Sequence, residues 1–211
     1  LNGGIKDGLV LYLDATSSLL SSSYGVAGDN ANWNSVIGNN GVLVNNPVYT
    51  GSYGGGMVFN GSNNYATINL NLSSTNYTIM AACKVLTLTS GRSIGGINNN
   101  WLMGHYSTNT VGYYAEGWVI NPTGSNDTNW RIYTATGNIS GDSYALYVNG
   151  VLVAVPNGNG SQGPNGICLG GDLQYHEFSN SQIGFIMVYN RVLSSTEITT
   201  IYSGSKGRFG L

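Results

Sequence analysis

Short runs of β-branched, aromatic and other apolar residues recur along the whole chain, and clusters of Gly, Asn, Ser and Pro separate them. Runs of this length at this spacing are typical of the strands of an all-β sandwich or barrel. No apolar run approaches the ~18 residues of a membrane-spanning helix. The expected strands are Leu9–Leu13, Met57–Phe59, Tyr65–Asn69, Tyr77–Val85, Trp101–Tyr106, Trp118–Ile120, Trp130–Ala135, Tyr144–Val148, Val151–Val155, Gly166–Leu169 and Gln182–Tyr189.

The clearest local signal is a β-hairpin around Asn149–Gly150, which joins two apolar runs. Asn-Gly supplies the two positive φ angles of a type I′ turn, the turn whose twist matches that of the strands. The hairpin is therefore expected to pair Val148 with Val151 and Leu146 with Val153.

One helix is expected, near the end of the chain. Ser194 and Glu197 have the spacing of a capping box, in which each side chain binds the other residue's backbone N–H. Gly204 is predicted to end this helix. The apolar positions that share one face are Ile198, Ile201 and Tyr202.

Charge is scarce, which excludes several classes of protein. Of 211 residues, 8% are charged against a usual ~25%, and 7 Lys+Arg against 9 Asp+Glu give a net charge of -2. Nucleic-acid binding needs clustered Lys and Arg, and no two basic residues here are adjacent. A membrane-surface protein would need a polybasic or amphipathic segment. We expect neither partner, and the length suits one all-β domain.

Cys83 and Cys168 both lie in strand-like segments. Two cysteines and two histidines without ligand spacing do not make a structural zinc site. We expect buried free thiols, with a disulfide as the alternative.

Several short motifs follow one another along the chain: Gly8–Asp14, Gly38–Gly41, Gly55–Gly61 with Tyr65, Tyr77–Ala81, Tyr147–Gly150 and Ile183–Ser194 with Glu197 and Ile198. Their succession resembles a laminin-G-like domain, a jelly roll of the concanavalin A-like lectin/glucanase superfamily. The resemblance implies two curved antiparallel sheets packed face to face, with binding on rim loops or on the concave face. It does not settle function, because this fold hosts lectins, glycosidases and inert modules.

The last six residues, Lys206–Leu211, resemble the endings of laminin-G-like domains in structural proteins of tailed phages. This resemblance implies a virion protein. We divide the chain into a jelly-roll domain, residues 1–203, and a tail, residues 204–211. Phe209 is expected to dock on its own domain or on a neighbour, and Arg208 to bind a backbone group or a carboxylate there. A frayed terminus is the alternative.

Sugar binding requires aromatic faces and polar groups that recognise hydroxyls, without a need for charge. We expect Tyr113, Tyr114, Trp118 and His176 to be exposed, whereas Trp33, Trp101 and Trp130 are expected to pack internally. The glycan-binding candidates are Tyr113, Tyr114, Trp118, His105, His176 and Glu177.

Carboxylates are too sparse to predict catalysis. A glycosidase needs two of them, roughly 5 to 10 Å apart, and none of the three glutamates has a second carboxylate within four residues. A pair formed across strands, Glu116 with Glu177 or Asp172, stays open. Calcium prefers several oxygens, and the loops at Asp29 and Asp127 each offer one carboxylate. We expect no enzyme and no cofactor.

The sequence therefore predicts a non-enzymatic structural or adhesion module of a virion, in a tail fibre, baseplate or head decoration. Its expected partners are host-surface glycan and other virion proteins. Low charge favours close packing of like subunits, so we expect a homo-oligomer, and a trimer suits a fibre. Two alternatives stay open: an assembly module without ligand, whose aromatic cluster lies in a subunit interface, and a secreted polysaccharide-acting enzyme with a carboxylate pair in a cleft.

Overall fold

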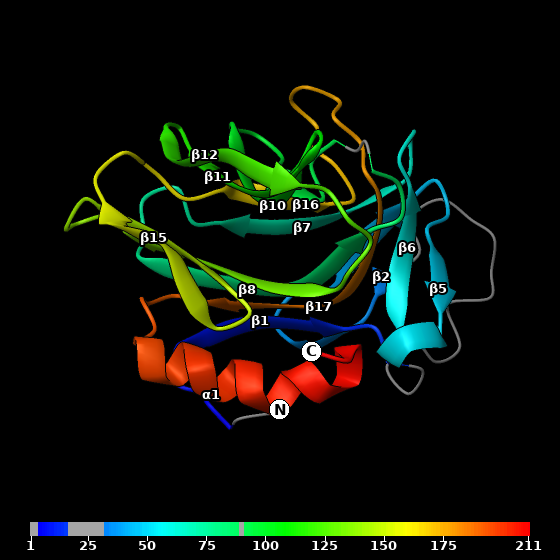
Figure 1. Cartoon of the computed structure of the whole chain (residues 1–211), viewed down its shortest axis with the longest axis horizontal. Helices are drawn as coiled ribbons and strands as arrows, with labels where there is room; N and C mark the ends of the chain where they lie inside the picture. Colours follow the sequence, from blue (N-terminus) through cyan, green and yellow to red (C-terminus); the bar gives the residue numbers. More distant parts are fainter. Residues whose placement is uncertain (1–3, 17–31, 89–90) are drawn as a thin grey trace.

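The computed structural model describes residues 4–16, 32–88 and 91–211. Two β-sheets lie one above the other, and helix α1 covers the outer side of the lower sheet (Figure 1). Every strand pairing in these ranges is antiparallel. The predicted all-β sandwich with one short C-terminal helix is confirmed.

The lower sheet, sheet A, has nine strands in the described part of the chain. In spatial order they are β15 (Val151–Asn157), β14 (Ser143–Val148), β13 (Arg131–Asn138), β8 (Tyr77–Val85), β17 (Asn180–Tyr189), β1 (Leu9–Asp14) and β3 (Ser35–Ile37), with β6 (Gly56–Asn60) beside β17 and β5 (Val48–Thr50) beside β6.

The upper sheet, sheet B, has eight strands in the same ranges. In spatial order they are β12 (Trp118–Ser125), β11 (Asn109–Ala115), β10 (Trp101–Tyr106), β9 (Ile94–Gly96), β16 (Asn165–Leu169), β7 (Tyr65–Asn71), β4 (Gly41–Val44) and β2 (Asn32–Trp33).

Large aromatic side chains fill the space between the sheets. Trp33, Trp101, Tyr77, Tyr113 and Tyr133 are all fully buried there. Their polar atoms are paired, since Tyr77 and Tyr113 share a hydroxyl hydrogen bond of 2.6 Å and the Trp101 indole N–H donates to Tyr77. A buried polar atom without a partner would destabilise this core. Trp33 and Trp101 therefore have the internal packing role that we predicted.

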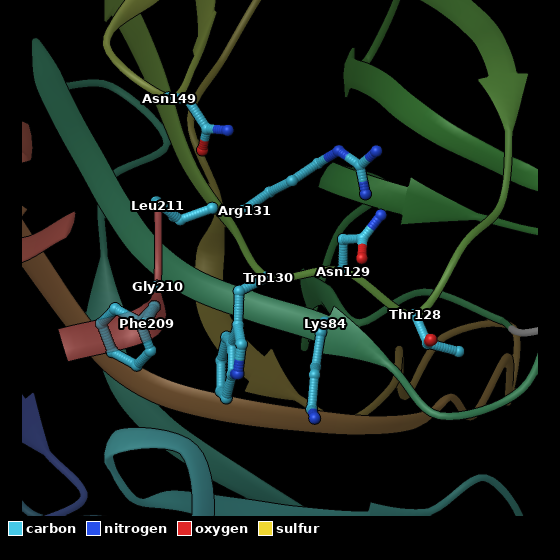
Figure 2. Close-up of a pocket in the computed structure, with 9 residues that line it drawn as sticks. All are labelled: Lys84, Thr128, Asn129, Trp130, Arg131, Asn149, Phe209, Gly210 and Leu211. Carbon is cyan, nitrogen blue, oxygen red and sulfur yellow. The ribbon is translucent and has the colours of Figure 1, made fainter. Parts of the chain in front are cut away.

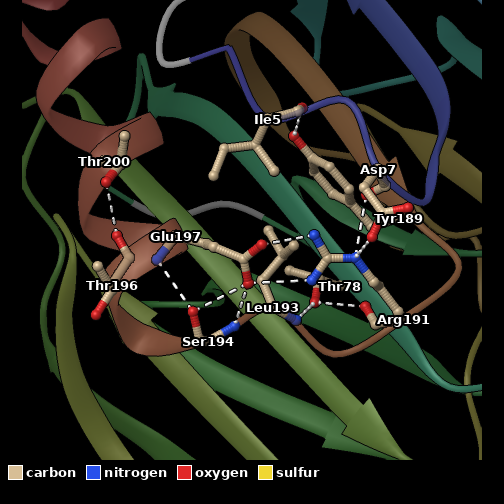
Figure 3. Close-up of polar contacts among 10 residues, drawn as sticks. All are labelled: Ile5, Asp7, Thr78, Tyr189, Arg191, Leu193, Ser194, Thr196, Glu197 and Thr200. Carbon is tan, nitrogen blue, oxygen red and sulfur yellow. Dashed lines mark hydrogen bonds and ion pairs between the residues drawn. The ribbon is translucent and has the colours of Figure 1, made fainter.

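Helix α1 (Ser195–Ser205) packs on the outer face of sheet A through Ile198 and Ile201. The capping box between Ser194 and Glu197 is present, and Arg191 binds both Glu197 carboxylate oxygens (Figure 3). These hydrogen bonds lower the pKa of Glu197 to about 2. No helix among the described residues is long and apolar enough to span a membrane.

The hairpin is confirmed at its turn and corrected in its register. Asn149 and Gly150 have φ angles of 51° and 75°, and Val148 pairs with Val151. Leu146, however, pairs with Ala154 rather than Val153, because the ladder shifts by one residue between Leu146 and Tyr147. Such a bulge depends on tertiary packing that the turn sequence does not report.

Cys83 lies in sheet A and Cys168 in sheet B, and both thiols are free and buried. The prediction of buried free thiols, rather than a disulfide, is thus confirmed. Burial raises the pKa of the Cys83 thiol to about 12 and raises that of Cys168 as well. Both therefore serve as small apolar core residues rather than as nucleophiles.

The chain continues in helical form beyond Gly204, where we had predicted an end. Helix α1 runs to Ser205 and leads into a 3-10 turn, η2 (Lys206–Phe209). Gly204 does not end the helix, because the residue after it, Ser205, is buried and the backbone N–H of Lys206 still bonds to the carbonyl of Tyr202. The division of the chain at residue 203 stays a prediction.

The tail docks on its own domain, which is one of the predicted outcomes and excludes a frayed terminus. Phe209 is buried against Trp130 and Phe185 on the outer face of sheet A, with ring centroids 4.7 Å and 5.8 Å away. Trp130 and Phe209 border a pocket of about 590 Å³ (Figure 2). Arg208 donates to the Asp14 carboxylate at 2.5 Å. The expected contacts of Phe209, Arg208 and Trp130 are confirmed.

Candidate carbohydrate-binding site

The centre of the candidate site is Arg92, which lies just before β9 and is almost fully buried. Its Nε bonds to the Glu177 carboxylate, and its Nη1 donates to Asn100 Oδ1 at 2.6 Å and to Asp172 Oδ2 at 3.3 Å. Nη1 also lies 3.4 Å from the Trp101 carbonyl oxygen. One guanidinium thus holds two carboxylates from the β16–β17 loop against the start of β10.

That loop, residues 170–179, lies directly on the outer face of β9. A Cβ atom at Gly95 would come within 2.7 Å of the Gly171 carbonyl oxygen, so only glycine permits this approach. Asp172 Oδ1 accepts a hydrogen bond of 2.7 Å from the Tyr175 backbone N–H, which fixes the turn. Tyr175 is consequently held on the solvent side of sheet B, where it is 50% exposed.

Two aromatic rings flank the guanidinium, and two more pack beside them. Arg92 lies over the rings of Tyr106 and Tyr175, at 5.7 Å and 5.1 Å from their centroids. Trp118 packs against Tyr106 at 6.0 Å and against Tyr114 at 5.0 Å. Tyr106, Tyr114 and Trp118 are half-buried. We call Tyr106, Tyr114, Trp118 and Tyr175 the aromatic platform, a set of partly exposed rings of which two, Tyr106 and Tyr175, contact an immobilised cation.

Tyr113 does not belong to the platform, and the prediction that it is exposed is wrong. Successive side chains of a strand point to opposite faces, so Tyr113 enters the core while Tyr114 faces outward. Tyr113 is fully buried, 5.9 Å from the Trp101 ring. Its position between the sheets keeps it away from any ligand on the surface.

His105 is also buried and cannot contact a ligand. It shares the inner face of β10 with Trp101 and Met103, and its ring lies 5.5 Å from that of Tyr133. Its Nδ1 lies 3.0 Å from Asn126 Oδ1, and burial lowers its pKa to about 4. The candidate assignment of His105 is therefore wrong.

Three more of the predicted residues do lie around the loop and platform. His176 is exposed beside Tyr175, and its ring lies 6.3 Å from Phe178. Glu177 binds Arg92 and accepts from the Tyr106 hydroxyl at 3.3 Å. Glu116 Oε1 accepts a hydrogen bond of 2.9 Å from the Asn100 backbone N–H.

Three residues of the site were missing from the predicted set: Arg92, Tyr106 and Tyr175. Strict alternation in β10 would have found Tyr106, because Trp101, Met103 and His105 occupy the other face. Tyr175 directly precedes two predicted residues, His176 and Glu177. Arg92 carries no local signal, since its carboxylate partner Asp172 is 80 residues away in sequence.

The two calcium candidates were Asp127 and Asp29. Asp127 is bound by Arg131 through two hydrogen bonds of 2.7 Å and 2.8 Å, which hold the pKa of this carboxyl well below its usual range. Asp29 lies outside the described residues. Within the described ranges, no three His, Cys, Asp or Glu side chains are grouped as metal ligands would be.

Comparison with known proteins identifies the family of this domain. Residues 59–199 match the family model described as the concanavalin A-like lectin/glucanases superfamily. The chain belongs to this superfamily. A search of curated proteins finds no match.

Two solved structures illustrate the likeness. One is domain 4 of AbnA, a GH43 extracellular arabinanase from Geobacillus stearothermophilus, in complex with arabinotriose: 17% identity and a TM-score of 0.64, over 94% of this chain and 100% of that one. The other is the Trypanosoma rangeli sialidase in complex with the inhibitor DANA: 18% identity and a TM-score of 0.62, over 94% of this chain. The chain spans about a third, 33%, of that sialidase. At these identities the likeness shows the fold.

Proposed function

We propose that this domain is a non-catalytic carbohydrate-binding module whose ligand stacks on the aromatic platform. The observation that carries the proposal is the position of Arg92, which fixes Tyr106 and Tyr175 in place before any ligand arrives. Preorganised ring faces beside polar side chains are what sugar rings require, since each sugar has apolar C–H faces and a rim of hydroxyls. The arabinanase domain in complex with arabinotriose supports this proposal.

The charges around Arg92 favour a neutral sugar. One guanidinium faces two carboxylates, Asp172 and Glu177, so its Nε and Nη1 donors are already engaged within the protein. An acidic sugar would bring a third carboxylate to the same place, and like charges at short range disfavour binding. We therefore propose a neutral oligosaccharide as the ligand.

The carboxylates of the site support binding without hydrolysis. Asp172 and Glu177 are tied to the same guanidinium, and Glu116 binds a backbone N–H. A retaining or inverting glycosidase needs one carboxyl free to act as an acid and a second free to act as nucleophile or base. All three groups have structural partners instead, which anchor the loop and the platform.

Binding is tested by calorimetry with arabinotriose and by a glycan array, on the whole chain. Trp118→Ala and Tyr175→Ala should each weaken binding about tenfold or more, because a stacked ring contributes about 1–2 kcal/mol. Tyr202→Ala, on helix α1 on the opposite side of the molecule, is the matched control and should bind like wild type. Binding that Trp118→Ala and Tyr175→Ala leave unchanged, or no binding to any glycan, would contradict the proposal.

The virion setting, the adhesive role and the trimer stay predictions. The motif at Lys206–Leu211 that suggested the virion setting has an intramolecular explanation, since Phe209 and Arg208 are anchored on their own domain. The glycan-binding proposal is independent of where the domain resides.

A further inference from the structure

A groove lies at the other half of sheet B, away from the aromatic platform. It has a volume of about 520 Å³ and lies between strands β4, β7 and β16 and the turn that joins β9 to β10. Its lining includes Asn39, Asn40, Val42, Thr67, Asn69 and Asn98.

The floor of the groove is the outer face of sheet B. Val42 of β4 pairs with Thr67 of β7, so the two side chains stand next to each other. Their neighbours Leu43 and Ala66 are buried in the core, which places Val42 and Thr67 on the side away from it. Asn69 follows two residues after Thr67 on the same face and is exposed.

The wall formed by residues 97–98 is held rigidly. The backbone N–H groups of Ile97 and Asn98 donate to the carbonyls of Gly166 and Asn165, at 3.2 Å and 3.0 Å. Gly166 has a φ of 79°, and a Cβ there would come within 2.8 Å of Ile97. Close contact with glycine thus fixes this wall against β16.

The opposite wall is fixed by amide hydrogen bonds. Asn39 Nδ2 donates to the Asn69 carbonyl at 3.1 Å, and Asn40 Oδ1 accepts from the Ser35 backbone N–H at 2.9 Å. The side-chain amides of Asn69 and Asn98 are exposed and make no hydrogen bond to any residue that the structure describes. Each retains two donors and an acceptor for a ligand.

The lining chemistry points to one class of ligand. None of the lining residues is charged, so none of them can form an ion pair with an acidic or basic group. Amides both donate and accept, as vicinal hydroxyls do, and Val42 and Ile97 offer small apolar surface to C–H groups. We propose that this groove is a second binding site, for a neutral, hydroxyl-rich saccharide.

The groove and the aromatic platform are separate sites. Between them runs the 170–179 loop, which lies on Gly95 and whose Phe178 stacks on Tyr65 of β7 at 5.8 Å. This second site does not require that the platform bind sugar, and the platform does not require the groove. Occupation of both would make the domain bivalent for a branched or multi-chain glycan.

The test is an NMR titration of the ¹⁵N-labelled whole chain with arabinotriose and cellotriose, and with a trigalacturonate as the acidic probe. The side-chain amide signals of Asn69 and Asn98 should shift and saturate with a neutral sugar. Asn69→Ala and Asn98→Ala should each weaken that binding about threefold to tenfold, the effect of one lost hydrogen bond. Asn190→Ala, an exposed asparagine at the end of β17, should have no effect.

The outcomes separate the two sites. Shifts of the Trp118 indole signal without shifts at Asn69 and Asn98 would support the platform and overturn the groove proposal. The reverse pattern would support the groove and count against the platform. Equal affinity of the groove for trigalacturonate would overturn the assignment to neutral saccharides.

Discussion

At the scale of single residues, His105 connects burial to pH. Its ring is enclosed between the sheets, and its Nε2 has no hydrogen-bond partner among the described residues. Burial lowers the pKa of His105 to about 4, although the nearby Asp127 carboxylate opposes this shift. The folded protein therefore accommodates the neutral ring far better than the charged one.

The burial of His105 predicts that the stability of the domain depends on pH. An unfolded histidine has a pKa of about 6.5, so between pH ~6.5 and ~4 the unfolded chain binds a proton that the folded chain does not. The free energy of unfolding should fall over this range as pH falls, by on the order of 3 kcal/mol. His105→Gln should flatten this dependence in urea denaturation, whereas His176→Gln, at an exposed ring, should keep it. Parallel profiles for wild type and His105→Gln would contradict the prediction.

Tyr113 and Tyr114 show that residue type alone does not determine which face of a strand a side chain occupies. Both were predicted to be exposed, and one is in the core. Asn109–Ala115 contains Asn109 and Gly112, residues of low strand propensity, and the sequence does not predict it as a strand, so its alternation was not applied. Once β11 is known to be a strand, the inward position of Ala115 settles the orientation of both tyrosines.

At the scale of elements, the hairpin at Asn149–Gly150 makes a second prediction. Gly150→Val should destabilise the domain by about 1–2 kcal/mol through the left-handed backbone conformation, and its Cβ would also meet Tyr202 at 2.9 Å. Val151→Thr, a change at a 65% exposed side chain next to the turn, is the control and should be near neutral. Urea denaturation measures both, and a neutral Gly150→Val would show that the turn tolerates other residues.

Strands were predictable where a long alternating run carries its own signal. The bounds of β8 and β10 agree with those read from the sequence, because Tyr77–Val85 and Trp101–Tyr106 are dense in apolar and aromatic residues. The short strand β9, Ile94–Gly96, was missed, since two of its three residues are glycines with low strand propensity. Its neighbours β10 and β16 make it a strand by pairing with it.

At the scale of the whole molecule, the site is assembled by topology rather than by any one segment. Arg92 meets Glu177 from 85 residues away, and the Gly95 backbone allows the intervening loop to lie on β9. Such a meeting depends on which strands are neighbours in sheet B, and local sequence does not specify that order. The sequence could therefore nominate Trp118, Tyr114 and Glu177 without identifying the residue that holds them together.

The C-terminal tail covers part of the outer face of sheet A. Phe209 is buried between Trp130 and Phe185, and Arg208 ties the same turn to Asp14. Phe209→Ala removes a ring from this cluster and leaves a cavity, so it should destabilise the domain by about 3 kcal/mol in urea denaturation. Lys206→Ala, at an exposed side chain in the same turn, should change stability by less than about 1 kcal/mol.

Sedimentation of the same two variants separates packing within one chain from packing between chains. Because Phe209 packs on Trp130 and Phe185 of its own chain, Phe209→Ala should lower the stability of the domain while its sedimentation coefficient stays that of wild type. A tail docked on a neighbouring subunit would behave differently, since the assembly would dissociate at micromolar concentration as the anchor is lost. A lower sedimentation coefficient for Phe209→Ala, with Lys206→Ala unchanged, would contradict the prediction. It would show that Phe209 packs at an interface between two subunits.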